Sequence, residues 1–422
     1  MPSSCARKKN RLKRFLSVLG PGLTTGAADD DPSGIATYSI AGAQLGTSLL
    51  WTAFVTWPLM AFVQLTCARI GMVTGRGLAG ALRQKCPRWL LFIAAAALLS
   101  ANIITIGADL AGMSDAAKML TGLDPRPFTF FFGVGITLAT AYFRYYQIAS
   151  VLKWLTLVLF AYVITAFILR PNWGSVLFNT FIPSWPHGHN AWQNLVAILG
   201  TTISPYLFFW QASQEVEEEK AMGRRMLISR EGATKREISD RQMDVAAGTF
   251  FSNLVMYFVI LTAALTLHEH NKTDIESSSQ VAEALKPLAG QFAATLYTIG
   301  LVGVGLLAIP VLAGSSAYAF AETFAWKEGL DKPVTSARYF YAAIGLSTML
   351  GIAMAFVRIN PIKALFWASV INGLLAPFLL VGILIVSGDH KLMQHQPSSW
   401  LSRVMVGLTA AVMFTAAVAM FC

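Results

Sequence analysis

Apolar stretches about 20 residues long recur along the whole chain, and they constrain its fold more than any other feature. An α-helix rises about 1.5 Å per residue, so about 20 residues cross the roughly 30 Å hydrocarbon core of a bilayer. We count about eleven such stretches and predict that each is a transmembrane helix, near residues 14–45, 48–75, 89–119, 127–143, 146–169, 191–216, 243–267, 289–325, 337–357, 361–387 and 403–421.

The composition supports a membrane protein over a water-soluble one. Charged residues make up 13% of the chain and hydrophobic residues 55%, whereas soluble domains carry about 25% charge. The first apolar stretch is too long and too polar for a secretory signal, so we expect it to be retained. The sequence therefore predicts an all-α integral membrane protein, which we expect in the plasma (inner) membrane.

Basic residues predict how the chain is oriented. Six of them precede the first stretch and place the N-terminus in the cytoplasm by the positive-inside rule: Arg7, Lys8, Lys9, Arg11, Lys13 and Arg14. Counting eleven crossings from there puts Arg144 and the basic run between Lys220 and Arg241 on the cytoplasmic side as well. Membrane topology thus accounts for the net charge of +10, and we expect no nucleic-acid partner.

The first stretch is interrupted by polar residues at membrane depth. Asp29, Asp30 and Asp31 are followed at once by Pro32. Proline removes an amide donor and clashes with the preceding turn, so the helix should open just before Pro32. Unwound backbone at this depth is stable only where it lines a cavity or is buried in protein, and an ionised Asp costs several kcal/mol there. We therefore predict that Asp31 faces an ion.

The sixth stretch repeats this interruption. Pro205 lies in mid-helix and follows the small and hydroxyl residues Gly200, Thr201 and Ser204. Five helices separate one break from the next, and an odd number means that the two five-helix units enter the membrane from opposite sides. This is the inverted-repeat plan, in which two discontinuous helices meet at the bilayer midplane and bind an ion there.

This plan divides the chain into consecutive parts. We expect a basic cytoplasmic N-terminus, a first repeat with helices 1–5, an outer loop, an inverted repeat with helices 6–10 that includes a cytoplasmic loop, and finally a linker with helix 11. The corresponding ranges are 1–13, 14–169, 170–190, 191–387 with the loop at 217–242, and 388–422.

The motifs at the two breaks resemble those of the Nramp family of metal ion transporters. The resemblance extends over nearly the whole chain from Gly20 and is strongest in Gly20-Pro21-Gly22, Asp31-Pro32-Ser33-Gly34, the residues 41–46 and 49–51, Asp109, and the residues 200–206. It implies a LeuT-like fold of two inverted five-helix repeats with helices 1 and 6 broken. It also implies import of manganese, iron or related divalent ions, usually together with protons.

Two departures from the family pattern change the expected metal site. Gly34 stands where the family has an asparagine ligand, and Ser204-Pro205-Tyr206 replaces the family's Met-Pro-His. Without the thioether the site offers oxygen only, which suits ions such as Mg²⁺ that keep much of their water. The resemblance thus implies a site for Mg²⁺ or Mn²⁺ at Asp31, Ser204, Gly34 and the carbonyls near Thr201 and Ala28.

The same comparison weakens the case for proton coupling. Tyr206 replaces the family's histidine and is a poor proton carrier at neutral pH, and Gly112 replaces an acidic residue. Asp109 remains; it either titrates or pairs with a neighbouring donor. We therefore expect weak or absent coupling. Other polar residues are assigned to the ion pathway or to the surroundings of the site, namely Asp29, Asp30, Ser369, Asn372 and Gln211, although hydrogen bonding between helices explains Gln211 equally well.

Two other transport functions stay open at this point. One is a proton-coupled Mn²⁺/Fe²⁺ importer of the ordinary Nramp type, and the other is a sodium-coupled symporter of a small organic solute, because the same fold serves both. An enzyme is not expected, since the sequence has no paired metal-ligand histidines, nucleophile elbow or phosphate loop. We expect no cofactor apart from the transported cation. The acidic residues 215 and 217–219 are expected to be a solvated helix end.

Overall fold

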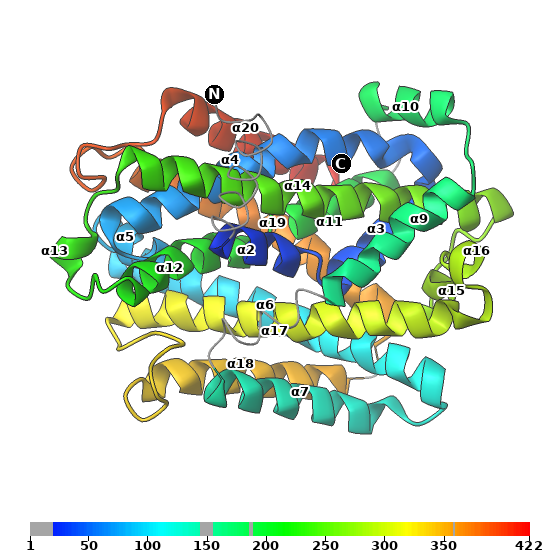
Figure 1. Cartoon of the computed structure of the whole chain (residues 1–422), viewed down its shortest axis with the longest axis horizontal. Coiled ribbons are helices and arrows are strands. Elements are labelled where there is room, and N and C mark those ends of the chain that lie inside the picture. Colours follow the sequence, from blue (N-terminus) through cyan, green and yellow to red (C-terminus); the bar gives the residue numbers. More distant parts are fainter. Residues whose placement is uncertain (1–19, 144–154, 185–188, 358) are drawn as a thin grey trace, which may run out of the picture.

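The computed structural model describes residues 20–143, 155–184, 189–357 and 359–422, and every regular element within these ranges is a helix. The all-α prediction is therefore confirmed for the described residues. The predicted cytoplasmic N-terminus at 1–13, the first residues of the first and fifth stretches, and Arg144 lie outside them. The long helices run side by side along the long axis of the molecule (Figure 1).

The first stretch forms two helices with a break between them. α2 covers Pro21–Asp29 and α3 covers Pro32–Leu45, with Asp30 and Asp31 in between. Pro32 occupies the first turn of α3, where the missing N–H costs nothing. Asp31 is the N-cap of α3, and its Oδ1 accepts the N–H of Gly34 at 2.7 Å. The helix thus opens where the sequence predicts.

The rest of the first unit follows the predicted stretches closely. α7 and α9 are the short crossings, and α9 is preceded by the 3₁₀ turn η2. A short helix, α10, occupies part of the predicted outer loop. The bounds are η1 Gly46–Leu49, α4 Leu50–Thr74, α5 Leu78–Leu82, α6 Arg88–Thr121, α7 Pro125–Tyr142, η2 Leu155–Leu159, α9 Phe160–Ile168 and α10 Trp173–Phe181.

The second unit begins with the other broken pair. α11 covers His189–Thr202 and α12 covers Pro205–Ala221, with the break at Ile203 and Ser204. The later elements are α13 Leu227–Arg230, α14 Lys235–Thr266, η3 His268–His270, α15 Ser278–Glu283, α16 Lys286–Ala289, η4 Gly290–Phe292, α17 Ala293–Phe324, α18 Arg338–Ala355, α19 Pro361–Ser387 and α20 Trp400–Ala419.

The predicted cytoplasmic loop 217–242 is largely helical, which corrects its boundaries. α12 continues to Ala221, and α14 already begins at Lys235. Thr234 starts α14 through a capping box, in which its hydroxyl accepts the N–H of Glu237 and the Glu237 carboxylate accepts the N–H of Thr234. Polar turns of this kind extend helices beyond the apolar stretch, so a hydropathy pattern alone misses them.

Each of the eleven predicted stretches coincides with a helix or a broken helix pair among the described residues. Seven spans in that part of the chain are long and apolar enough to cross a membrane by length and composition. One of these spans, Pro32–Thr74, joins α3 to α4, and the predicted crossings outside the seven are α7, α9 and α18. The structure thus agrees with a protein embedded in a bilayer.

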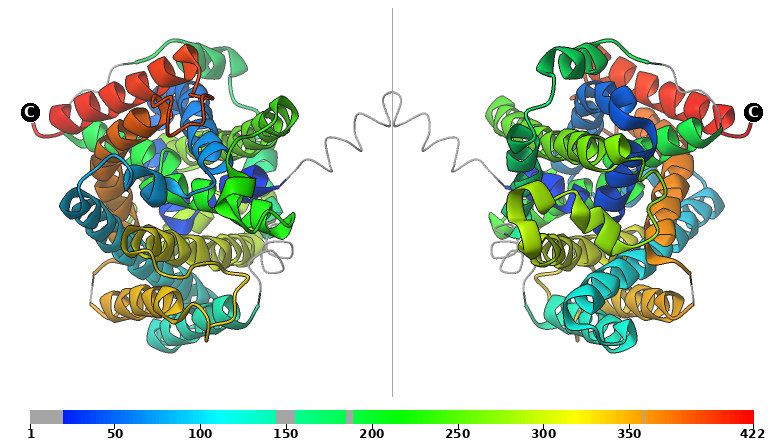
Figure 2. Two further views of the ribbon diagram at one scale, coloured as in Figure 1. Left: turned by 90° about the vertical axis from the view of Figure 1, so that its left-hand side faces the viewer. Right: turned by 90° about the vertical axis from the view of Figure 1, so that its right-hand side faces the viewer.

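Glycines allow the broken helices to approach their neighbours very closely. A Cβ at Gly26 of α2 would lie 2.5 Å from the carbonyl carbon of Gly248 in α14, and a Cβ at Gly200 of α11 would lie 2.1 Å from the carbonyl oxygen of Ser369 in α19. Real Cβ atoms do not approach so closely, so these helices touch backbone to backbone. Seen end on, α7 and α18 lie at one edge of the bundle and α20 lies at the opposite edge (Figure 2).

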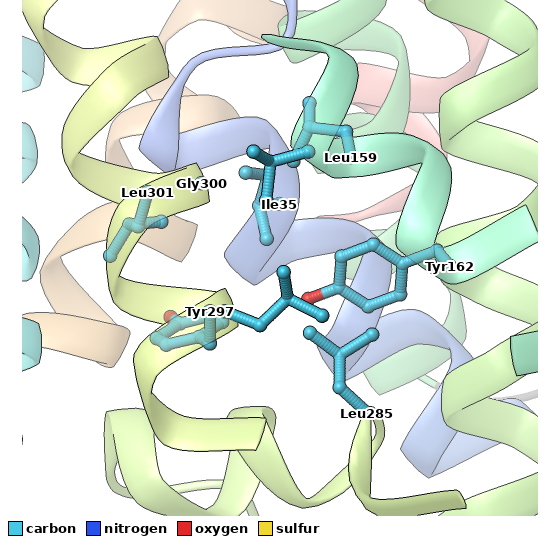
Figure 3. Close-up of a pocket in the computed structure, with 9 residues that line it drawn as sticks. Ile35, Leu159, Tyr162, Leu285, Tyr297, Gly300 and Leu301 are labelled. Carbon is cyan, nitrogen blue, oxygen red and sulfur yellow. The ribbon is translucent and has the colours of Figure 1, made fainter. Parts of the chain in front are cut away.

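One small cavity lies between α3, α9 and α17 (Figure 3). Its volume is about 10 Å³, and its lining is apolar apart from the hydroxyls of Tyr162 and Tyr297. A space of this size holds at most about one water molecule. Because no carboxylate lines it, this cavity is distinct from the site at the helix breaks.

Candidate ion-binding site

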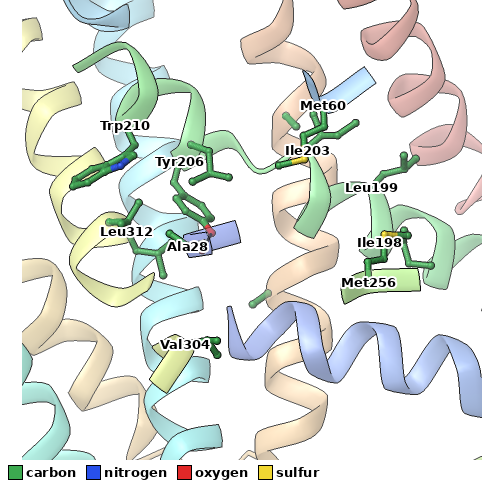
Figure 4. Packing of buried hydrophobic residues seen from close by; sticks show 14 of the residues in the cluster. Ala28, Met60, Ile198, Leu199, Ile203, Tyr206, Trp210, Met256, Val304 and Leu312 are labelled. Carbon is green, nitrogen blue, oxygen red and sulfur yellow. Dashed lines mark hydrogen bonds between the residues drawn. The ribbon is translucent and has the colours of Figure 1, made fainter. Parts of the chain in front are cut away.

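The two helix breaks meet in the interior of the protein. A Cβ at Gly34, in the first turn of α3, would lie 3.0 Å from Thr201 Oγ1 in α11 and 3.6 Å from Asp31 Oδ1. Tyr206 of α12 reaches the end of α2, where its hydroxyl donates to the carbonyl oxygen of Ala28 at 3.1 Å (Figure 4). The four half-helices α2, α3, α11 and α12 thus come together around Asp31.

Asp31 is buried at this meeting point, with 2% of its surface exposed. Within the described part of the chain, no Lys, Arg or His side chain forms an ion pair with it. A buried carboxylate without a positive partner is costly, and it is stabilised when a cation binds. The position of Asp31 is therefore what an ion site requires.

The polar groups of the second break lie on the opposite side. The Ser204 hydroxyl donates to the carbonyl oxygens of Thr201 at 2.6 Å and Gly200 at 3.1 Å, so its lone pairs stay available. Thr201 Oγ1 is buried and has no hydrogen-bond partner. Gly34 contributes no side chain, and a Cβ there would also lie 3.4 Å from Tyr38 Cε2, so the Tyr38 ring borders the same place.

The pathway residues on α6 and α19 connect to α3 through hydrogen bonds. Ser33 donates to Asp109 Oδ1 at 2.8 Å, and the hydroxyls of Thr37 and Ser369 are 2.9 Å apart. Asn372 lies one step further out, where its amide donates to the Thr105 hydroxyl at 3.2 Å. Asp109 thus has a neighbouring hydrogen-bond donor, as expected if it pairs with one and does not titrate. Its Oδ2 is buried without a partner.

Asp29 and Asp30 both contact α14 rather than α11. The Ser252 hydroxyl lies 2.7 Å from Asp29 Oδ2 and 3.2 Å from Asp30 Oδ1. Both carboxylates are buried, with 0% and 4% of their surfaces exposed. They therefore border the break on the side that faces α14.

Gln211 does not lie at the break. Its amide donates to Glu215 Oε1 at 2.7 Å, further along α12. Glu215 is 1% exposed and Glu219 is 3% exposed, so the expectation of a solvated helix end is wrong for these two residues. Each has an arginine partner: α14 brings Arg241 to within 2.8 Å of Glu215, and Arg224 lies 3.4 Å from Glu219.

Arg241 and Asp244 tie the start of α2 to α14. Arg241 contacts Asp244 Oδ2 at 2.6 Å and also pairs with Glu218. Asp244, fully buried, accepts the N–H groups of Gly20 at 2.8 Å, Gly22 at 2.8 Å and Leu23 at 3.0 Å. We call this arrangement the Asp244 cap. It satisfies the free amides of the first turn of α2 with a charged acceptor.

A pocket of about 200 Å³ opens beside these residues, at the end of the molecule that carries α13. Acidic side chains dominate its lining, together with two arginines: Glu215, Glu218, Glu219, Glu237, Asp240, Arg224 and Arg241. The predicted orientation makes this the cytoplasmic end. The pocket is consistent with a vestibule that collects cations.

Sequence reasoning missed three residues around the break: Ser33, Tyr38 and Ser252. Ser33 holds Asp109, Ser252 contacts two carboxylates, and the buried hydroxyl of Tyr38 has no hydrogen-bond partner. The polar pair Ser252-Asn253 interrupts an otherwise apolar stretch, and this signal marks α14 as a neighbour of the break.

The described residues contain no group of three or more His, Cys, Asp or Glu side chains that could hold a metal ion. An ion at Asp31 would consequently have few protein ligands, all of them oxygen: one carboxylate, hydroxyls and backbone carbonyls. Hard divalent cations that keep part of their water shell bind in such surroundings.

Comparisons with known proteins agree with this reading. A family model described as Natural resistance-associated macrophage protein-like matches residues 22–422. The chain is 27% identical to the divalent metal cation transporter MntH of Caldanaerobacter subterraneus, over 96% of this chain and 94% of that protein. Its fold resembles that of the Eremococcus coleocola manganese transporter, with a TM-score of 0.71, 18% identity and coverage of 99% and 87%. The nucleobase-cation symporter Mhp1 gives a TM-score of 0.56 at 15% identity, with coverage of 95% and 90%.

Proposed function

We infer the function from one premise, that this chain belongs to the Nramp family. It is accordingly a divalent metal cation transporter and not an enzyme, embedded in a membrane through a LeuT-like fold of two inverted five-helix repeats. The predicted fold class and family are thus confirmed. The positions of the ion ligands, the preferred ion and the coupling to protons are our proposals.

We propose that Asp31 binds the transported ion through its carboxylate, assisted by oxygens of Thr201, Ser204 and Ala28. The observation that carries this proposal is the burial of Asp31 at the meeting of both breaks, without a basic partner among the described residues. The ion is reached by alternating access, in which the half-helices move about a fixed site. Ser369 and Asn372 contribute to the water-lined surroundings.

We propose that Mg²⁺ and Mn²⁺ are favoured over Fe²⁺. The groups around Asp31 are oxygens, and Gly34 adds no ligand of its own. Softer transition metals gain from a thioether or imidazole, neither of which the second break offers, since Ser204 and Tyr206 occupy these positions. Mn²⁺ remains among the favoured ions because it accepts carboxylate, carbonyl and water ligands.

Uptake by reconstituted vesicles tests the function and the ion preference together. Purified protein in liposomes should take up Mn²⁺, and external Mg²⁺ should compete with it more strongly than Ca²⁺ does. Sodium with a panel of amino acids serves as the comparison for a symporter of organic solutes. Thermal unfolding of the protein in detergent gives a second readout. If an amino acid with sodium raised the unfolding temperature and no divalent cation did, the proposal would be contradicted.

Ser204→Met should shift the selectivity toward softer ions. A thioether at this position adds a ligand that favours Mn²⁺ or Cd²⁺, so the ratio of Mg²⁺ to Cd²⁺ uptake should fall by about tenfold. Uptake of both ions by the same vesicle preparation measures the ratio. Thr202→Met is the matched control, because the Thr202 hydroxyl bonds to Ile198 of its own helix. An unchanged ratio would show that Ser204 does not face the ion.

We propose that transport is coupled weakly or not at all to protons. The Tyr206 hydroxyl donates a hydrogen bond to the carbonyl oxygen of Ala28, and Asp109 accepts one from Ser33. Neither side chain therefore resembles a free proton carrier. Metal uptake should therefore leave the internal pH of proteoliposomes unchanged, as a trapped pH-sensitive dye reports. A clear internal acidification that depends on Mn²⁺ would support the ordinary proton-coupled type instead.

We also propose the orientation and the division of the chain. The N-terminus faces the cytoplasm of the plasma membrane, residues 14–169 form the first repeat and residues 191–387 the second. The acidic pocket beside α13 then opens to the cytoplasm, and α15 and α16 lie outside (Figure 1). Modification of the Gly223→Cys variant by a membrane-impermeant reagent, in intact and in opened cells, tests this orientation.

A further inference from the structure

The Tyr38 ring borders the ion site without being one of the ligands proposed above. Tyr38 lies four residues after Gly34 on α3, one helical turn further from the break. Side chains of an α-helix lean toward its N-terminus, so Tyr38 covers the turn that contains Gly34. A Cβ at Gly34 would lie 3.4 Å from Tyr38 Cε2. The same point lies 3.0 Å from Thr201 Oγ1 and 3.6 Å from Asp31 Oδ1.

The polar end of the Tyr38 ring is the part that reaches this point, because Cε2 is bonded to the carbon that carries the hydroxyl. The side chain is 0% exposed, and its hydroxyl has no hydrogen-bond partner. Thr201 Oγ1 is also buried without a partner, and it lies close enough to Tyr38 to interact with its hydroxyl. One hydrogen bond between the two would still leave one hydroxyl hydrogen without an acceptor.

A water molecule bound to the ion would satisfy these hydroxyls. Buried polar groups are almost always hydrogen-bonded, either to protein or to water. A cation holds water by its oxygen, so the hydrogens of that water point away from the ion and donate to acceptors around it. The hydroxyl oxygens of Tyr38 and Thr201 are such acceptors. A methyl group is about as large as a water molecule, and Gly34 lacks the methyl group that would lie between them and Asp31.

We propose that Tyr38 is a specificity-determining residue, whose hydroxyl holds one water molecule of the hydrated ion at Asp31. This inference rests on the proposed function and deepens it, because it indicates how the site distinguishes one divalent ion from another. Mg²⁺ gives up its water reluctantly and usually keeps several water ligands. Mn²⁺ exchanges its water more readily. A hydroxyl that holds a coordinated water therefore favours Mg²⁺ more than Mn²⁺.

Tyr38→Phe in reconstituted vesicles tests the proposal, because it removes the hydroxyl and keeps the ring. The Mg²⁺ concentration that halves Mn²⁺ uptake should rise about tenfold, as expected for the loss of one hydrogen bond to a charged group. The KM and the maximal rate of Mn²⁺ uptake should each change less than about threefold, since Mn²⁺ depends less on its water. Damage to the fold would lower Mn²⁺ uptake as well, so the two measurements together separate specificity from structure.

Tyr162→Phe is the matched control. Tyr162 is 2% exposed, and its hydroxyl is likewise buried without a partner. It borders the small cavity between α3, α9 and α17, which no carboxylate lines (Figure 3). Competition by Mg²⁺ should be unchanged in this variant. Unchanged competition in Tyr38→Phe, or an equal loss in Tyr162→Phe, would show that the Tyr38 hydroxyl does not serve the ion.

Gly34→Ala provides an independent check, because its methyl group takes the place of the water. Alanine favours a helix over glycine, and the new Cβ would meet Thr201 Oγ1 at 3.0 Å, which a small shift of the threonine relieves. Mg²⁺ competition should weaken about as much as in Tyr38→Phe, and the double variant should be no weaker than either single one. Losses that multiply in the double variant would contradict a shared water molecule.

The outcomes separate this inference from the proposed function. If Asp31→Asn takes up Mn²⁺ normally, the ligand role of Asp31 is overturned, and the role of Tyr38 with it. If Asp31→Asn loses uptake while Tyr38→Phe keeps full Mg²⁺ competition, only the role of Tyr38 is overturned. Absence of Mg²⁺ competition in the unmodified protein overturns the Mg²⁺ preference and the role of Tyr38, and leaves Asp31 to be judged by its own variant.

Discussion

Asp31→Ala should reduce Mn²⁺ uptake into liposomes to the level of protein-free vesicles while the protein stays folded. The Asp31 carboxylate is the only charged group that we assign to the ion site, so its loss removes the main attraction for a dication. The substitution also removes the N-cap of α3, at a cost of about 1 kcal/mol. Uptake and thermal unfolding, measured on the same preparation, report the two effects.

Asp31→Asn separates these two roles. Asparagine is as good an N-cap as aspartate, so its side-chain oxygen can still accept the N–H of Gly34. Stability should therefore match that of the unmodified protein, and uptake should still be lost because the charge is gone. If Asp31→Asn transports normally, the carboxylate is not the ion ligand.

Asp244→Ala should lower the free energy of unfolding by roughly 3 kcal/mol, because three amides of α2 lose their acceptor in a buried place. Arg241 loses one of its three carboxylate partners at the same time. Thermal unfolding in detergent measures the effect. Because the start of α2 is then no longer tied to α14, the variant should also show altered Mn²⁺ uptake.

Asp240→Ala is the control for this prediction. Asp240 lies one turn before Asp244 on α14, and its ion pair with Arg236 has an N–O distance of 3.8 Å and an arginine that is 80% exposed. Exposed pairs contribute about 1 kcal/mol or less. Equal destabilisation by both substitutions would show that the Asp244 cap contributes no more than a surface charge.

The helix breaks were predictable from the sequence because their causes are local. Pro32 and Pro205 each open the helix that they interrupt, and Asp31 caps the segment that follows it. The spacing of the two breaks also gave the inverted repeat. These features depend on neighbours within a few residues, which a sequence displays directly.

Contacts between distant segments were not predictable in this way. Ser252 and Asp29 are 223 positions apart, and Asp244 and Gly22 are 222 apart. No pattern in either segment indicates its partner. Glu215 was misjudged for the same reason: an acidic residue near a helix end is usually solvated, and only the position of Arg241 makes its burial possible.

The glycine contacts between α2 and α14 have a mechanical consequence. Gly22 and Gly26 rest on the backbone around Gly248, so no side chains of these residues interlock across the contact. Interdigitated ridges must disengage before a helix can tilt, whereas smooth surfaces glide. The resistance of α2 to tilting is therefore concentrated at its two ends, in the Asp244 cap and in the hydrogen bonds that Ala28 and Asp29 accept from α12 and α14, and little of it is distributed along the helix.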